Sequence, residues 1–342
     1  MERNMRQWLA DQIAAKKKKP LPVLSFPSIT LMGITVKELI SDSDNQARGM
    51  KMIADKADTA AAVSLMDLSL EAECFGSEIW FSDDEVPTVT GSIVTDPESA
   101  EALKIPQVGI AGKTAGAGRT SIYIEAAQKA MQLITDRPVF AGTIGPLSLA
   151  ARLVSVSEAM IYFYEEPEMM HTLIAKATDF LIAYIQEYKK AGSNGIVMAE
   201  PVTGLLSPAL AEEFSLPYVK KINEAVRSEN FIMIYHNCGN ATIHMIDSIL
   251  AVNADAYHFG NAIDMAEMMK HIPENIIAMG NISPAGEFLM GNPESIRKAT
   301  LELLSKCGGY PNFIISSGCD IPPLSSWTNI DAFFAAVKEY YG

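Results

Sequence analysis

The sequence predicts an α/β protein built as a (β/α)8 barrel, and two observations lead to this fold class. Short apolar runs rich in β-branched residues recur along the chain, and longer segments with helical periodicity separate them. Eight such βα repeats suggest a parallel sheet that closes into a barrel. The 342 residues are compatible with a single domain over 1–342, because barrels commonly reach this length.

The predicted elements follow from this periodicity. We expect strands at 21–26, 61–66, 138–143, 195–199, 231–236, 255–259, 275–280 and 312–317. We expect helices at 36–57, 158–191, 208–227, 242–251, 293–307 and 327–341, and helix-start signals such as Asn292-Pro293 precede several of them. An amphipathic stretch at 5–15 predicts an N-terminal helical extension before the first strand.

An insertion follows the second predicted strand, at roughly 68–118. It contains an acidic turn at 82–85 and a Gly-rich stretch at 111–119. Loops that follow barrel strands build the active site, so the insertion could form a lid or one wall of a cleft. A surface excursion without a functional role is the alternative.

The composition excludes several classes of function. The net charge is −14 and the isoelectric point is near 4.9, which disfavours nucleic acids and anionic membranes as partners. No apolar stretch reaches the roughly 18 residues needed to cross a bilayer, and no signal peptide is recognisable. We therefore expect a cytoplasmic protein, whose four cysteines remain thiols or metal ligands.

Three soft ligands follow two of the predicted strands. His236 and Cys238 close the fifth strand, and residues two apart on a strand point to the same side. Cys319 closes the last strand, and the strand ends of a barrel face one cleft. One imidazole and two thiolates suit Zn²⁺ and leave an open fourth position, as catalytic zinc sites do. The alternative is that each is an unrelated core residue, as we expect for Cys74 and Cys307.

Other polar side chains follow the remaining strands and fall at the same rim. Glu200 could complete the zinc shell or handle a proton, and His258 is the other candidate for a catalytic role. We expect Asp67, Glu71, Asn281 and Ser283 to line the substrate cleft. A solvated surface position is the alternative for Asp67 and Glu71.

The His236-x-Cys238 pair with the distant Cys319 resembles the zinc motif of methylcorrinoid:thiol methyltransferases in the uroporphyrinogen decarboxylase superfamily. Segments that match in kind and order are 71–76, 145–147, 200–208, 217–218, 280–284 and 317–323. The resemblance implies a distorted barrel with zinc at its C-terminal face. It also implies a thiol substrate such as coenzyme M, and a methyl-Co(III) corrinoid donor that a separate corrinoid protein carries.

The resemblance leaves other functions open. Tetrahydrofolate is an alternative methyl acceptor, and a non-catalytic barrel that binds a corrinoid is a further possibility. Uroporphyrinogen decarboxylase is a close competitor by fold, but Met5-Arg6-Gln7 matches only the start of its Arg-containing N-terminal motif and lacks the second Arg. The zinc motif and the acidic chain favour methyl transfer over decarboxylation.

Overall fold

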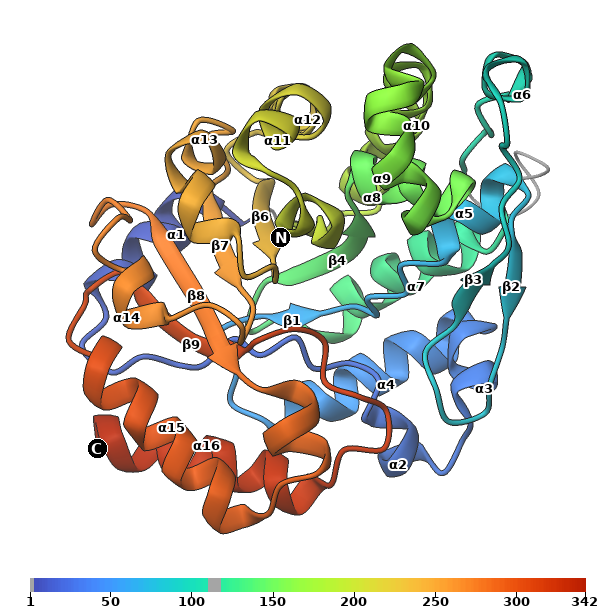
Figure 1. Ribbon diagram of the computed structural model, residues 1–342. Helices are drawn as coiled ribbons and strands as arrows, with labels where there is room; N and C mark the ends of the chain where they lie inside the picture. The colour runs from blue at the N-terminus through green and yellow to red at the C-terminus, as the bar shows by residue number, and fades with distance from the viewer. Residues whose placement is uncertain (1–2, 110–117) are drawn as a thin grey trace.

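The computed structural model describes residues 3–109 and 118–342 and has an α/β architecture, in which helices surround a curled parallel sheet (Figure 1). Within these residues the sheet has seven strands in the order β1-β4-β5-β6-β7-β8-β9. Neighbouring strands are all parallel, as βα repeats require. The strands are β1 (Ala62–Val63), β4 (Val139–Ile144), β5 (Gly195–Ala199), β6 (Ile232–Asn237), β7 (Ala256–Phe259), β8 (Ile277–Ile282) and β9 (Phe313–Ser317).

The helices lie outside the sheet or in the loops that join its strands. No helix in the described part of the chain is long and apolar enough to span a membrane. The longer helices are α1 (Met5–Ala14), α4 (Ser43–Lys56), α7 (Thr120–Leu133), α8 (Pro146–Val154), α9 (Val156–Glu165), α10 (Pro167–Lys190), α12 (Leu216–Val226), α15 (Pro293–Cys307) and α16 (Trp327–Tyr341). The shorter ones are α2 (Ser28–Met32), α3 (Val36–Ile40), α5 (Leu70–Phe75), α6 (Pro97–Ala102), α11 (Pro208–Phe214), α13 (Ile246–Leu250), α14 (Met265–Met268), η1 (Pro201–Leu205), η2 (Thr242–Met245) and η3 (Pro284–Leu289).

The strand predicted at 21–26 is not a strand, and this prediction was wrong in detail. Pro20 and Pro22 lack an N–H group, so the segment cannot form a regular ladder. It nevertheless lies between the two edges of the sheet. The N–H of Leu21 donates to the carbonyl of Ile315 in β9, and the carbonyl of Pro20 accepts from Ala60 just before β1. The remaining seven predicted strands all overlap observed strands.

Three predicted helices are each divided into two. The helix predicted at 36–57 breaks at Asp42, whose side chain caps α4. The helices predicted at 158–191 and 208–227 break where Pro167 and Pro217 open a new helix, because proline has no N–H for the preceding turn. The segment predicted as a helix at 242–251 begins as a 3-10 turn and continues as α13. The helices predicted at 293–307 and 327–341 have the expected bounds.

The insertion after β1 carries α5, α6 and an antiparallel hairpin of β2 (Glu78–Trp80) and β3 (Thr88–Thr90). The hairpin lies along one side of the molecule, at the right of Figure 1. The side chain of Lys176 in α10 donates to three carbonyls at the end of α6, and so joins the insertion to the barrel wall. Most of the Gly-rich stretch at 111–119 falls outside the described residues.

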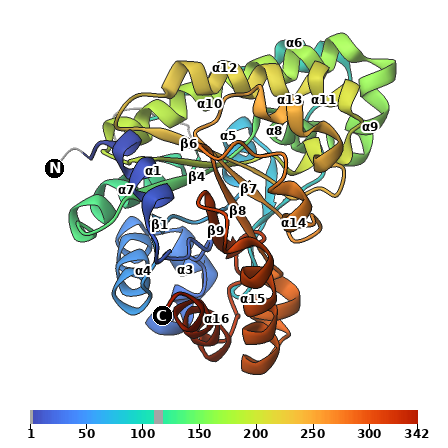
Figure 2. The ribbon, with the colours of Figure 1, turned by 90° about the vertical axis from the view of Figure 1, so that its left-hand side faces the viewer.

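The N-terminal helix α1 lies across the amino ends of the strands (Figure 2). Its Trp8 packs edge-on against Phe140 of β4, with ring centroids 5.7 Å apart. Met5 and Trp8 are buried in the same apolar cluster as inward-facing strand residues such as Ile234 and Ile314. The predicted extension thus closes the amino end of the barrel, which leaves the carboxyl ends of the strands as the open end.

Candidate functional site

The predicted metal ligands lie at the carboxyl ends of β6 and β9. His236 is buried within β6, and Cys238 follows the last residue of that strand. Cys319 follows β9 after Gly318. Burial raises the pKa of Cys319 to about 12, and the neighbouring Cys238 thiol adds to this shift. The two thiols are therefore electrostatic neighbours although their strands lie far apart in the sequence.

His236 has one nitrogen engaged and one without a partner. Its Nδ1 lies 2.7 Å from Nδ1 of His258 and 3.2 Å from the carbonyl oxygen of the same residue. Its Nε2 is buried and has no hydrogen-bond partner. Burial lowers the pKa of His236 to about 4, so the ring is neutral at physiological pH. Because buried polar atoms are normally paired, this unpartnered nitrogen makes His236 a candidate ligand for a metal or a substrate.

The donor chemistry fits a zinc ion. Neighbouring thiols and an unpartnered imidazole nitrogen are the groups that Zn²⁺ prefers. The described side chains do not, however, form a closed set: no group of three or more His, Cys, Asp or Glu residues among them is gathered closely enough to hold a metal. The trio is thus a candidate metal centre whose ligands stand at the carboxyl ends of β6 and β9, two strands that β7 and β8 separate in the sheet, and the three side chains are not drawn together.

Glu200 follows β5 at the same rim, but both of its oxygens are occupied. Oε1 accepts from the N–H of Ser148 at 2.7 Å and Oε2 accepts from the N–H of Leu147 at 3.1 Å. The carboxylate therefore caps the first turn of α8, where a negative charge is favoured. Burial raises the pKa of Glu200 to about 7. The geometry assigns this residue first to the positioning of α8.

His258, the other predicted catalytic residue, lies beside His236 in the register of β6 and β7. Its Nε2 is 2.7 Å from the hydroxyl of Ser316 in β9. Since His236 engages its Nδ1, both ring nitrogens have partners inside the protein. Both nitrogens are thus engaged within the protein, and the predicted catalytic role of His258 stays a prediction.

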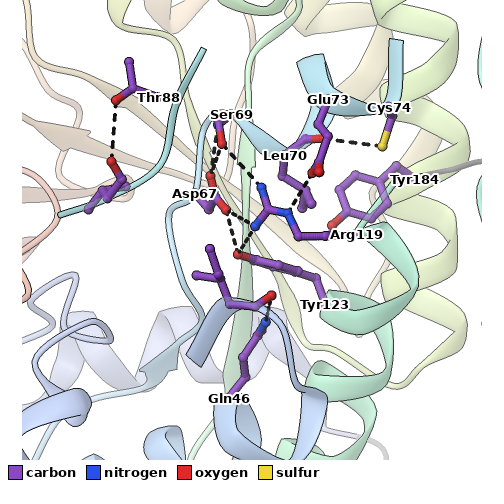
Figure 3. Close-up of polar contacts among 12 residues, drawn as sticks. Gln46, Asp67, Ser69, Leu70, Glu73, Cys74, Thr88, Arg119, Tyr123 and Tyr184 are labelled. Atoms are coloured by element: carbon purple, nitrogen blue, oxygen red, sulfur yellow. Dashed lines mark hydrogen bonds and ion pairs between the residues drawn. The ribbon is translucent and has the colours of Figure 1, made fainter. Parts of the chain in front are cut away.

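Asp67 lies at the base of the insertion and is fully engaged (Figure 3). Its Oδ2 accepts from Arg119 at 2.6 Å and from the hydroxyl of Tyr123 at 2.8 Å. Its Oδ1 accepts from the N–H and the hydroxyl of Ser69. Arg119 also donates to Glu73 at 2.7 Å. Asp67 and Arg119 stand at the two ends of the insertion, so their ion pair joins these ends.

Glu71 keeps one oxygen unpartnered. Its Oε1 accepts from the hydroxyl of Thr143 and from the N–H of Ile144, whereas Oε2 is buried and has no hydrogen-bond partner. Burial raises the pKa of Glu71 to about 7, so the group exchanges a proton near neutral pH. Of the two acidic residues predicted to line the cleft, Glu71 is the one with an oxygen available.

Asn281 and Ser283 shape the loops at the rim. The amide of Asn281 donates to the carbonyls of Gly260 and Ile263, which orders the loop after β7. The hydroxyl of Ser283 accepts from the N–H of Gly286 and caps η3. Their predicted contact with substrate stays a prediction.

Sequence reasoning missed several residues of this region. The Oδ1 atom of Asp320 is buried and unpartnered, and the position of this residue directly after Cys319 was the available signal. Arg119 lies at the end of a Gly-rich stretch that carries no local sign of an ion pair. Ser316 is the last residue but one of β9, and its sequence context indicates only an ordinary buried strand residue.

Comparisons with known proteins show the family of this chain. The family model for uroporphyrinogen decarboxylase (URO-D) matches residues 27–340. The uroporphyrinogen decarboxylase of Coxiella burnetii is 26% identical over 297 residues, which cover 82% of this chain and 77% of that protein. The methylcobamide:CoM methyltransferase MtbA of Methanosarcina acetivorans is 26% identical over 284 residues, which cover 80% of this chain and 78% of that protein.

Solved structures share the fold. A methyltransferase from Methanosarcina mazei superposes with a TM-score of 0.84 over 99% of both chains, at 22% identity. A B12-independent methionine synthase from Shewanella superposes with a TM-score of 0.63 over 95% of both chains, at 12% identity. These likenesses confirm the distorted barrel that the sequence predicted. Because the family model spans nearly the whole chain, the protein belongs to the uroporphyrinogen decarboxylase family.

Proposed function

We propose that the protein is a zinc-dependent methyltransferase that moves a methyl group from a methyl-Co(III) corrinoid to a thiol such as coenzyme M. The observation that carries this proposal is the pairing of neighbouring thiols, Cys238 and Cys319, with the orphaned Nε2 of His236. The likeness to a methylcobamide:CoM methyltransferase supports the same reaction.

The chemistry follows from the donor set. Zinc held by His236, Cys238 and Cys319 would bind the substrate thiol as its thiolate, since a coordinating thiol loses its proton. The substrate sulfur would then form a bond to the methyl carbon of the donor, while the carbon–cobalt bond would break and its electron pair would stay on cobalt as Co(I). The neutral ring of His236 adds no positive charge to the site, so the substrate sulfur keeps its nucleophilicity.

The open end of the barrel suits a docked carrier protein. Exposed apolar side chains lie in the segments that follow four different strands of the seven-stranded sheet: Trp80, Leu205, Met290 and Leu324. Exposed apolar groups gathered at one face of a molecule mark a surface for a partner. A corrinoid protein that presents its macrocycle to this end would cover them, and we infer that such a protein is the partner.

The alternative reaction, decarboxylation of uroporphyrinogen, has less support. A substrate with many carboxylates needs free cationic side chains at the cleft. Arg6 is instead paired with Asp255 at the amino end of the barrel, and Arg119 is held by Asp67 and Glu73. The family likeness favours this reaction.

Metal analysis and a methyl-transfer assay test the proposal together. The full-length protein, purified and supplied with zinc, should hold about one zinc ion per chain. Cys238→Ser and Cys319→Ser should each lower the zinc content, whereas Cys307→Ser should not, since Cys307 is buried at the far end of α15. Protein that retains no zinc refutes the proposal.

The assay uses free methylcobalamin with coenzyme M, other thiols and tetrahydrofolate as acceptors. Methylation of a thiol supports the proposal. Methylation of tetrahydrofolate alone would show that tetrahydrofolate, and not a thiol, is the methyl acceptor. Cobalamin binding without turnover on any acceptor would identify a non-catalytic corrinoid-binding barrel. Conversion of uroporphyrinogen to coproporphyrinogen would establish the decarboxylase instead.

A further inference from the structure

A line of buried polar groups runs from His236 across the inside of the barrel. Nδ1 of His236 is 2.7 Å from Nδ1 of His258, and Nε2 of His258 is 2.7 Å from Oγ of Ser316. The same Oγ is 2.7 Å from the backbone carbonyl oxygen of Leu21. The side chains of His236, His258 and Ser316 are all buried, so hydrogen bonds within the protein determine which atom carries each hydrogen.

The carbonyl of Leu21 determines which group donates in each hydrogen bond of this line. A carbonyl oxygen only accepts, so the single hydroxyl hydrogen of Ser316 points to it. The oxygen of Ser316 must then accept from His258, which places a hydrogen on Nε2 of that ring. A neutral His258 therefore has a lone pair on Nδ1, and His236 must donate to it from its own Nδ1.

A second contact gives the same direction independently. Nδ1 of His236 also lies 3.2 Å from the carbonyl oxygen of His258. A lone pair on this nitrogen would face the lone pairs of the carbonyl, whereas an N–H group donates to it. Both contacts thus place the hydrogen of His236 on Nδ1.

We infer that His258 and Ser316 are positioning residues, which hold His236 in the tautomer whose Nε2 carries the lone pair. This inference rests on the proposed function, because the lone pair on Nε2 is the one that a zinc ion would share. The hydrogen-bond line keeps a hydrogen from occupying that position before the metal arrives. It also fixes the rotation of the imidazole ring, and such support of a ligand typically changes metal affinity by about 10- to 100-fold.

The tautomer can be measured without metal and without substrate. We would label the zinc-free full-length protein with 15N-histidine and record long-range 1H–15N correlations, which separate Nδ1–H from Nε2–H rings. The chain has five histidines, so the signals of His236 can be assigned by their loss in a His236→Gln variant. His236 should be protonated on Nδ1 and His258 on Nε2. Protonation of His236 on Nε2 overturns the inference.

Ser316→Ala removes the hydroxyl that orients His258, and Ser317→Ala is its matched control. Ser317 is the next buried residue of β9, and its hydroxyl accepts from the N–H of Val23 in the same N-terminal segment. The two variants therefore lose one buried hydroxyl each, but of these two hydroxyls only that of Ser316 contacts a histidine side chain, because Ser317 contacts His258 through its backbone. Ser316→Ala should mix the tautomers of His236 and weaken zinc binding by about 10- to 100-fold in a chelator competition.

The outcomes separate this inference from the proposed function. If the parent binds zinc and Ser316→Ala changes neither tautomer nor affinity, the inference is overturned and the function stands. If Ser317→Ala weakens zinc binding as much as Ser316→Ala, the effect is a general loss of packing, and the inference is again overturned. If the parent binds no zinc, the proposed function fails, and the tautomers of the metal-free protein still decide the inference.

Discussion

The ion pair between Asp67 and Arg119 should hold the base of the insertion closed. Asp67→Asn keeps the size of the side chain and removes its charge. The new amide would face Nη1 of Arg119 and the hydroxyl of Tyr123 in place of the oxygen that accepts from both. Arg119 would keep only Glu73 as an anionic partner.

The loss of unfolding free energy expected for Asp67→Asn follows from the burial of the ion pair. The side chain of Asp67 is fully buried and that of Arg119 is 11% exposed. Removal of one member of a buried ion pair costs about 3–5 kcal/mol. Because Glu73 still neutralises part of the Arg119 charge, we expect the lower end, about 3 kcal/mol of unfolding free energy. Glu73→Gln is the matched control, and should cost about 1 kcal/mol because Glu73 is partly exposed and makes one contact.

Urea unfolding followed by circular dichroism measures both variants, and limited proteolysis reports whether the insertion opens first. Asp67→Asn should unfold at markedly lower urea than Glu73→Gln and should be cut sooner within the insertion. A loss below about 1 kcal/mol for Asp67→Asn would refute the anchoring role. Normal stability with loss of activity would instead favour the substrate-binding role that the sequence predicted for this residue.

Three further predictions concern buried carboxyls and a lysine. Burial raises the pKa of Glu71 from 4.5 to about 7, so between these pH values the folded protein holds a proton that the unfolded chain releases. The free energy of unfolding should therefore fall by about 3 kcal/mol as pH rises from 4.5 through 7. Glu71→Gln should flatten this pH dependence, which urea titrations at several pH values would measure. Glu200→Gln should behave differently and lose about 1–3 kcal/mol at neutral pH, because its amide nitrogen would oppose the N–H of Leu147 or Ser148; an unfolding midpoint equal to that of the parent contradicts the capping role. Lys176→Met should speed amide hydrogen exchange in α6, because three carbonyls lose their donor, and unchanged exchange there would show that α6 is held by other contacts.

The sequence carried enough information to place the candidate metal ligands at the carboxyl ends of two strands, because these placements depend on local geometry. The two-residue spacing of His236 and Cys238 and the position of Cys319 after an apolar strand are both local patterns. The bounds of α15 and α16 were predicted for the same reason, since their capping residues are adjacent in the chain. The segment at 21–26 was misread because its apolar pattern outweighed its prolines.

The roles of individual side chains depended on distant partners. The sequence places Asp67 and His258 at the rim, where an unengaged residue would face substrate. Their partners, Arg119 and Ser316, lie 52 and 58 positions away and are brought near only by the folded chain. Periodicity predicts which way a side chain points. It does not show whether a residue far away in the sequence already forms a hydrogen bond or an ion pair with that side chain.

The N-terminal segment at 20–26 has a consequence for folding order and for truncation. Contacts between this segment and β9, such as Val23 with Ser317 and Leu21 with Ser316, join residues 294 and 295 positions apart. Contacts of such high sequence separation close the longest loops and are expected to form late. The part of β9 that leads into Cys319 is therefore completed when the two ends of the chain meet. A fragment trimmed to the residues that match the family, 27–340, would retain all three predicted ligands and yet lose the segment that joins them to the rest of the barrel.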